Sequence, residues 1–176
     1  MMKRKIYLAG MALTALSALV VMIFLIRIPV YAIRASDAIE WAKSQVGKQI
    51  GNGQCTRLSE AYAMKFFGLK LTTTPKEYPY ADVPDGWEKI EYHPGFIPSP
   101  GDIAIWTPGR GPWGWIGDNG HTAIILSATE HELVSVDQNW DADGKGSAAQ
   151  IVTHPYNSFW GVLRPPVVYP VLQLDG

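Results

Sequence analysis

The sequence GHTAIILSATEHELVSVDQN, residues 120–139, decides the fold. Two runs rich in Ile, Val, Leu and Thr flank a short polar segment, the pattern of a β-hairpin. It predicts strands at residues 121–127 and 133–138, joined by a turn centred near Glu130. A hairpin of this kind requires an antiparallel sheet, so the rest of the chain has to supply strands that extend it and helices that cover it.

The register of this hairpin determines which polar side chains meet. With the turn centred on Glu130, Asp137 lies opposite Ala123 and Asn139 lies opposite His121. All three polar side chains then share one face of the sheet. A slip of one residue would turn Asp137 and Asn139 away from His121. The arrangement therefore predicts a hairpin loop with an odd number of residues.

The elements around the hairpin indicate the fold class. A helix is expected at residues 37–46, capped by Ser36, and a second from Cys55 to about residue 67, stopped by Gly68. Residues 69–100 have no clear period and predict a long surface loop with one short helix or strand. Further strands are expected at residues 102–106, 149–153 and 158–164, and a Gly-rich loop at 107–120. Helices followed by adjacent strands predict an α+β domain with an antiparallel sheet of about five to six strands.

The first 35 residues predict export. Three cations at positions 3–5 precede an uninterrupted apolar run at residues 6–26, long enough to span the roughly 30 Å core of a bilayer. The segment is either a cleaved signal peptide or a retained transmembrane anchor, and both alternatives stay open. The basic start should remain inside, which places the rest of the chain on the extracytoplasmic side. We expect a signal or anchor at 1–35, a catalytic domain at 36–165 and an extended tail at 166–176.

Charge and cysteine content exclude several classes of function. Five of the fifteen cations lie in the first 35 residues, which hold no acid, so the body has ten cations against sixteen acids. An acidic body argues against nucleic-acid binding, which needs a basic surface. A single cysteine excludes an intramolecular disulfide and a Cys-rich zinc site. We expect no metal and no cofactor, and a monomer.

Cys55 has two possible roles. A lone cysteine is often a small buried hydrophobe. Here, however, it starts a predicted helix after a Gly-rich turn that should leave the sulfur accessible, and its neighbours Gln54, Thr56 and Arg57 are polar. Unpaired N–H groups and the positive end of the helix dipole stabilise a thiolate at such a position. These features favour a reactive thiol.

A reactive thiol needs a base, and His121 is the best placed of the four histidines. It opens a strand directly after a Gly-rich loop, which predicts a ring held rigidly on one side and exposed on the other. His131 lies in the hairpin turn, and His93 and His154 each precede a proline, so these three are expected at the surface or in structural roles. A third group usually orients a catalytic imidazole, and Asp137 and Asn139 are both candidates.

These residues resemble the cysteine- and histidine-dependent amidohydrolase/peptidase (CHAP) domains of the NlpC/P60 group. The stretches that carry the resemblance, in the family's order, are GQCT (53–56), GDIAIW (101–106), GHTAII (120–125), VDQNW (136–140) and FWGVLRP (159–165). The resemblance implies a papain-like fold and cleavage of amide bonds in bacterial peptidoglycan, with Cys55 as nucleophile and His121 as general base. The family's third position often carries Glu with an Asn two residues on, and here Asp137 stands in its place. No acid lies between residues 41 and 59, so the calcium site of some relatives is not expected.

The expected mechanism is acyl transfer through a thioester, with the backbone N–H of Cys55 and the Gln54 side chain as oxyanion donors. Four tryptophans either line a substrate groove or serve as core and loop packing: Trp106, Trp113, Trp115 and Trp140. The bond could be that of an endopeptidase or of an N-acetylmuramoyl-L-alanine amidase. The alternatives are an amidase or acyltransferase acting on a non-wall substrate, and a catalytically inactive wall-binding module.

Overall fold

The computed structural model describes residues 33–71, 74–111, 114–140 and 145–167, and for residues 110, 111, 114 and 115 it describes the backbone alone. All of them belong to the second of two units of the chain, Ile33–Gly176. Residues 1–32 of the predicted signal or anchor segment and residues 168–176 of the predicted tail lie outside the described residues. Within the described part, no helix is both long and apolar enough to cross a membrane.

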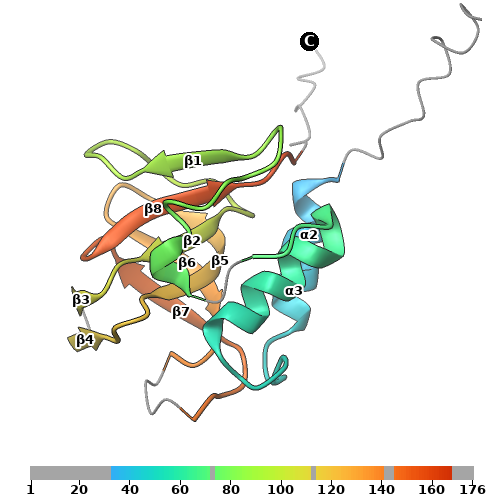
Figure 1. Ribbon diagram of the computed structural model, residues 1–176, viewed down its shortest axis with the longest axis horizontal. Coiled ribbons are helices and arrows are strands. Elements are labelled where there is room, and N and C mark those ends of the chain that lie inside the picture. The colour runs from blue at the N-terminus through green and yellow to red at the C-terminus, as the bar shows by residue number, and fades with distance from the viewer. Residues whose placement is uncertain (1–32, 72–73, 112–113, 141–144, 168–176) are drawn as a thin grey trace, which may run out of the picture. The chain divides into compact units, whose positions relative to one another are not determined.

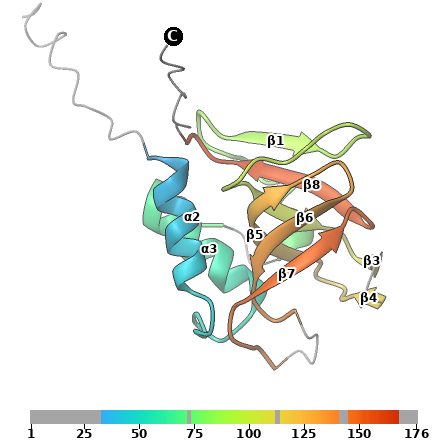
Figure 2. The ribbon, with the colours of Figure 1, turned by 180° about the vertical axis from the view of Figure 1, so that it is seen from behind.

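Two α-helices lie side by side against one side of a sheet (Figures 1 and 2). Helix α2 (Ala35–Ser44) begins and ends two residues earlier than expected. Its N-cap is Arg34 rather than Ser36. Ser36 lies inside the helix, so the predicted Ser36 cap is wrong. Helix α3, Cys55–Phe67, has the predicted ends and stops at Gly68, whose φ of 64° is the left-handed conformation typical of a helix C-terminus.

The described residues form one six-stranded antiparallel sheet, in the order β1-β8-β2-β5-β6-β7, and a separate β3-β4 hairpin. Every predicted strand is present, with each end within two residues of its predicted place. The loop predicted at 69–100 holds both a 3₁₀ helix, η1 (Pro75–Glu77), and strand β1, and the Gly-rich loop holds β3-β4. The strands are β1 (Glu88–Glu91), β2 (Ile103–Trp106), β3 (Gly109–Gly111), β4 (Gly114–Ile116), β5 (His121–Ala128), β6 (Glu132–Asp137), β7 (Gln150–Pro155) and β8 (Phe159–Arg164). The α+β class is confirmed.

The β5-β6 hairpin has the predicted register for a reason that the sequence did not reveal. Ala123 faces Asp137 as predicted, but the pair nearest the turn, Ala128 and Leu133, encloses four residues, so the predicted odd loop length is wrong. Nearer the turn, however, the pairing is offset by one residue, and a β-bulge between Ile125 and Ser127 corrects it. Without the bulge Asp137 would lie opposite Ile124 and point to the other face of the sheet. The bulge therefore places the Asp137 side chain on the same face as His121.

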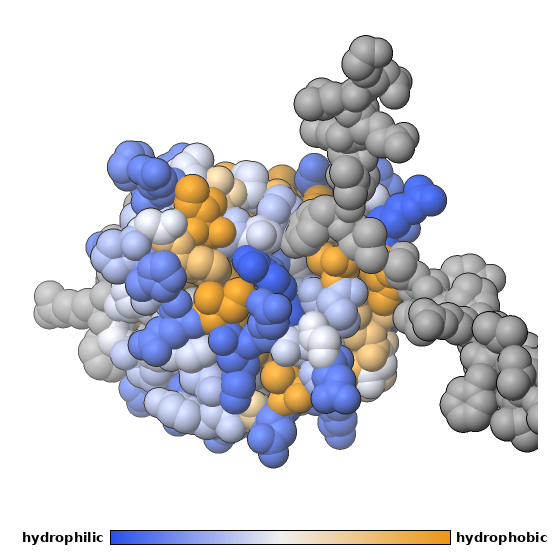
Figure 3. Space-filling view, turned by 90° about the horizontal axis from the view of Figure 1, so that it is seen from above, coloured by the Kyte–Doolittle hydropathy of each residue, from blue (hydrophilic) through white to orange (hydrophobic). Residues whose placement is uncertain are grey.

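Alternate residues of the strands build two hydrophobic clusters on opposite faces of the sheet. The first lies between sheet and helices and includes Leu58 and Tyr62 of α3 with Ile124 of β5. The second, on the other face, includes Trp106 and Leu133. Viewed from above, the surface mixes hydrophilic side chains with several separate hydrophobic patches, without one continuous apolar face (Figure 3).

A buried ion pair joins the start of β2 to the end of β8. Asp102 is fully buried, and its two carboxylate oxygens accept from Nε and Nη2 of Arg164 at 3.0 and 2.8 Å. The Ser99 backbone N–H donates to the same carboxylate at 2.8 Å. Burial raises the pKa of Asp102, and the Arg164 guanidinium opposes that rise. The pair thus stabilises the neighbouring strands β2 and β8 only while both partners are present.

We predict that Arg164→Leu lowers the free energy of unfolding by about 3–5 kcal/mol, because it leaves a buried carboxylate without its counter-charge. Urea denaturation measures this loss. The matched control is Arg57→Leu, which removes an ion pair from a side chain that is 46% exposed and should cost at most about 1 kcal/mol. Equal losses for the two variants would contradict the structural importance of the buried pair.

Candidate active site

Cys55 is the first residue of α3, and its thiol is surrounded by polar groups. The residue is 8% exposed and belongs to neither hydrophobic cluster. Burial alone would raise the pKa of the thiol, but the hydrogen bond and positive charge of His121 and the backbone N–H groups of Thr122 and Thr56 lower it below the ordinary value. The prediction of an accessible sulfur is wrong, because β5 and its loop close over the helix start. The polar surroundings that favour a thiolate are nevertheless present.

His121, the first residue of β5, connects the thiol to a buried carboxylate. Its Nε2 lies 2.7 Å from Oδ2 of Asp137, which leaves Nδ1 to face Cys55. Burial disfavours the imidazolium, but hydrogen bonds and charges of Asp137 and Cys55 outweigh it and raise the pKa of His121 to about 10. The ring is 7% exposed, so the predicted exposed side is wrong. A thiol with a lowered pKa beside an imidazole with a raised one is the arrangement of a thiolate–imidazolium pair.

Asp137 is a fully buried carboxylate that hydrogen bonds keep ionised. Oδ1 accepts from the Ser135 hydroxyl at 2.5 Å, and Oδ2 lies within hydrogen-bonding distance of His121 and His154. Burial would raise its pKa, but these partners lower it to about 2. Asp137 therefore contacts His121 directly, as one of the two sequence alternatives requires.

Asn139, the other alternative, lies outside the strand. Its φ is 59°, a left-handed conformation, so it does not continue the register opposite His121. Its Nδ2 donates to Oε1 of Gln54 at 3.0 Å, and its Oδ1 accepts from the Gly146 N–H. Asn139 thus holds the side chain of Gln54, the residue before Cys55, and fixes which way that amide points.

Gln138, between these two residues, holds the backbone of the loop that leads to Cys55. Its Oε1 accepts from the Ile50 N–H at 2.7 Å, and its Nε2 donates to the carbonyl oxygens of Ile50 and Gln54 at 2.9 and 2.8 Å. Asp137, Gln138 and Asn139 are consecutive, so one short segment positions the imidazole, the helix start and the Gln54 amide. The sequence marked this stretch but assigned no role to Gln138.

Two further features fix the start of β5, one against α3 and one against β2. The Ser59 hydroxyl, one turn after Cys55, lies 3.1 Å from the Thr122 hydroxyl, which donates to the Ala104 carbonyl. Gly120, just before His121, has a φ of 77°, and a Cβ there would be 2.5 Å from the Trp106 carbonyl oxygen. Only glycine allows this close approach, which sets the position at which His121 enters the sheet.

The remaining histidines divide into two exposed ones and one that sequence reasoning missed. His93 and His131 are exposed, as predicted. His154 is fully buried, and its Nε2 lies 3.0 Å from Oδ2 of Asp137. Strand β7 extends two residues past its predicted end and includes His154. A longer strand prediction would have placed this ring on the same face as Asp137.

The tryptophans differ from one another. Trp106 is 1% exposed and packs behind the site, so it cannot line a substrate groove. Trp140 is partly exposed and packs edge-on against His121 and His154, with ring centroids 5.2 and 4.4 Å apart. Trp113 and the side chain of Trp115 lie outside the described residues. Trp140 is therefore the tryptophan that the structure places both beside His121 and at the surface.

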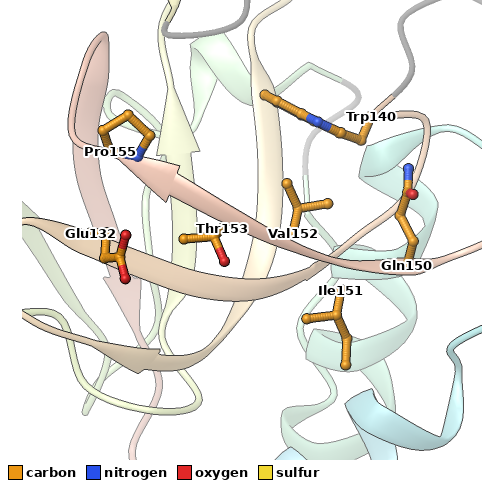
Figure 4. Close-up of a pocket in the computed structure, with 7 residues that line it drawn as sticks. All are labelled: Glu132, Trp140, Gln150, Ile151, Val152, Thr153 and Pro155. Atoms are coloured by element: carbon orange, nitrogen blue, oxygen red, sulfur yellow. The ribbon is translucent and has the colours of Figure 1, made fainter.

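Trp140 also borders a hollow of about 570 Å³ over the outer strand β7. Figure 4 shows Trp140 at one side of this hollow, near Val152, with Glu132, Thr153 and Pro155 toward the other end. Cys55 does not line it. The hollow therefore shares Trp140 with the surroundings of His121 but does not include Cys55.

Tyr78, just after η1, is a second residue that sequence reasoning missed. It is fully buried in the cluster that includes Leu58 and Tyr62 of α3, and its hydroxyl has no hydrogen-bond partner among the described residues. Burial, with the negative charge of Cys55 as a smaller cause, raises its pKa, so it stays a neutral donor. No sequence pattern in the loop predicted this position.

Comparison with solved structures finds similar folds, and no known family matches the sequence. The endolysin LysIME-EF1 superimposes with a TM-score of 0.69 at 27% identity over 77% of this chain and 65% of that one. Ly7917 gives 0.55 at 17% identity over 75% and 62%, and PlyC gives 0.53 at 20% over 75% and 36%. This chain thus covers less than two thirds of the length of each. The last two likenesses concern the fold alone.

We predict that alkylation of Cys55 by iodoacetamide rises with pH in two steps. The first step should lie below pH ~8.5, the value of a free thiol, because the thiolate forms early beside the imidazolium. The second step should lie near the His121 pKa of about 10, where loss of the imidazolium proton leaves a more basic and more nucleophilic thiolate. In His121→Ala a single step should lie at or above that of a free thiol. A wild-type profile that matches a simple thiol would contradict the ion pair.

Proposed function

We propose that this chain is a peptidoglycan hydrolase of the CHAP type, with a papain-like arrangement, which cleaves an amide bond through a thioester on Cys55. The observation that carries the proposal is the buried series of contacts from Cys55 through His121 to Asp137 at the start of α3. A nucleophile, a base and a group that orients the base are the parts that acyl transfer by a cysteine enzyme needs.

The reaction starts with attack of the Cys55 thiolate on the carbonyl carbon of the scissile amide. The backbone N–H of Cys55, unpaired within the helix because it lies in the first turn, and the Gln54 amide stabilise the oxyanion. The His121 imidazolium then protonates the leaving amine, and the C–N bond breaks to leave a thioester. Neutral His121 next removes a proton from water as the water oxygen attacks the thioester carbonyl. The C–S bond then breaks, the acyl group leaves as a carboxylic acid, and Cys55 is again a thiolate beside the His121 imidazolium.

Asp137 and Asn139 have separate roles in this proposal. Asp137 orients His121 and stabilises its positive charge, because it contacts Nε2 directly. Asn139 acts on the oxyanion side, because it holds Oε1 of Gln54 and so directs the donor end of that amide. We therefore assign the orientation of His121 to Asp137 in this proposal.

The substrate class rests on the likeness to LysIME-EF1, an endolysin, at 27% identity. Endolysins are enzymes that degrade bacterial cell walls, and peptidoglycan contains the amide bonds that this mechanism requires. An extracytoplasmic location, through a signal peptide or a membrane anchor in the first 35 residues, would bring the domain to that substrate. Trp140, beside His121 and at the surface, is the proposed contact for the wall peptide or glycan.

We predict that Cys55→Ala and His121→Ala abolish lysis of purified cell walls, measured as loss of turbidity, while circular dichroism shows a folded domain. The reason is that each variant removes a reacting group and no part of the core clusters. Mass spectrometry of wild-type digests should show new amino termini released from peptidoglycan, and their position identifies an endopeptidase or an amidase. Lysis by Cys55→Ala at the wild-type rate would refute the mechanism. A wild-type protein that hydrolyses only small amides or esters would refute the substrate.

A second pair of variants separates the roles of Asp137 and Asn139. Asp137→Asn should lower kcat by roughly 10²–10⁴-fold and shift the alkylation profile of Cys55, because His121 loses its charged partner. Asn139→Ala should lower kcat by roughly 10–10²-fold through the oxyanion donor and leave the alkylation profile in place. A shifted profile in Asn139→Ala together with a normal profile in Asp137→Asn would reverse the assignment.

A further inference from the structure

His154 occupies an unusual position for a histidine. Its ring is fully buried on strand β7, and its Nε2 lies 3.0 Å from Oδ2 of Asp137. The same oxygen is 2.7 Å from Nε2 of His121. Two imidazoles from two different strands therefore meet at one carboxylate oxygen of a third strand.

His154 contributes a hydrogen-bond donor to the Asp137 carboxylate. An ionised carboxylate can only accept, so Nε2 of His154 must carry its proton when it bonds Asp137. With the Ser135 hydroxyl on Oδ1, Asp137 receives three hydrogen bonds that involve both oxygens. Bonds from three directions fix the position and the plane of the carboxylate, and hence the direction in which it accepts from His121.

No other polar contact explains a histidine here. Nδ1 of His154 is buried and has no partner among the described residues, which makes the ring costly compared with an apolar side chain. Trp106 and Trp140 pack against it with ring centroids 4.6 and 4.4 Å away, and both also pack against His121. Because each tryptophan contacts both imidazoles, a shift of the His154 ring affects the packing of the His121 ring.

We propose that His154 is a positioning residue of the reactive centre, which acts on Cys55 through Asp137 and His121. The proposal rests on the proposed function insofar as Cys55 is the nucleophile, but its effect on the thiol does not require the wall substrate. The titratable groups that face His154 are Asp137 on β6 and His121 on β5. Glu132 on β6 is also titratable and pairs with Pro155, the residue after His154 on β7. Its side chain faces the other side of the sheet.

The consequence is a measurable change in thiol chemistry. Without the His154 donor, Asp137 has a vacant acceptor site in a buried environment and can rotate away from His121. The His121 imidazolium then loses the carboxylate that stabilises it, and the Cys55 thiolate loses the positive charge of His121. The first step of the Cys55 alkylation profile should therefore move to higher pH, toward that of a free thiol.

The experiment compares three variants of the full chain by the pH dependence of iodoacetamide alkylation of Cys55 and by thermal unfolding. His154→Leu removes the donor and should slow alkylation near pH 6 by roughly tenfold or more, because the first step of the profile moves to higher pH. His154→Gln keeps an N–H close to the position of Nε2 and should restore most of the alkylation rate and the pH of the first step. Leu133→Ala truncates the buried residue that pairs with His154 across β6 and β7, and should lower Tm with the profile unchanged.

Two results would overturn the proposal. One is a wild-type alkylation profile in His154→Leu, and the other is a profile shift in Leu133→Ala as large as in His154→Leu at the same loss of Tm. Wall lysis measured in parallel separates this proposal from the proposed function. If the wild-type protein does not release peptidoglycan fragments but the His154→Leu shift is present, the substrate assignment fails and the positioning role stands.

Discussion

The ionised carboxylate of Asp137, buried with no exposed surface, is the constraint on which the rest of the site depends. A charge in that environment is tolerated only when it is fully hydrogen-bonded and near an opposite charge. Ser135 and His154 supply hydrogen bonds, and His121 supplies both a hydrogen bond and the charge. Because His121 is thereby kept protonated, the thiol of Cys55 on the neighbouring helix is favoured as a thiolate. The lowered pKa of the thiol thus depends on a group that does not contact the sulfur.

The fold is arranged around this carboxylate. The bulge in β5 gives the hairpin the register that brings Asp137 to the face of His121. The two residues that follow Asp137 bind the segment before Cys55, so the end of β6 positions the helix start as well as the base. The backbone before Cys55 also packs closely against the segment after β6, since a Cβ on Gly53 would be 2.9 Å from the Gly146 Cα. A small number of contacts thus links elements that are more than eighty residues apart in the sequence.

The sequence predicted the features that depend on local signals. Helix α3 has its expected ends because a Gly-rich turn and Gly68 mark them, and the strands of the central hairpin follow from their apolar runs. Strand β1 was not identified because its exposed residues Glu88 to Glu91 have no apolar pattern. The burial of Cys55 and His121 depends on packing between distant elements. Asn139 leaves the strand through a left-handed φ, for which the neighbouring sequence gives no signal. His154 contacts Asp137 diagonally across the sheet, although its direct cross-strand partner is Leu133, so strand pairing does not predict the contact.

The central claim is that His121 is a stable imidazolium at neutral pH, held between Asp137 and Cys55. Nitrogen-15 NMR of histidine-labelled protein tests it most directly, because the ring nitrogen shifts report protonation without substrate or chemical modification. The account predicts that both nitrogens of His121 carry protons at pH 7 and that the ring titrates near pH about 10. A His121 titration with a midpoint near ~6.5, the value of an isolated histidine, would contradict it.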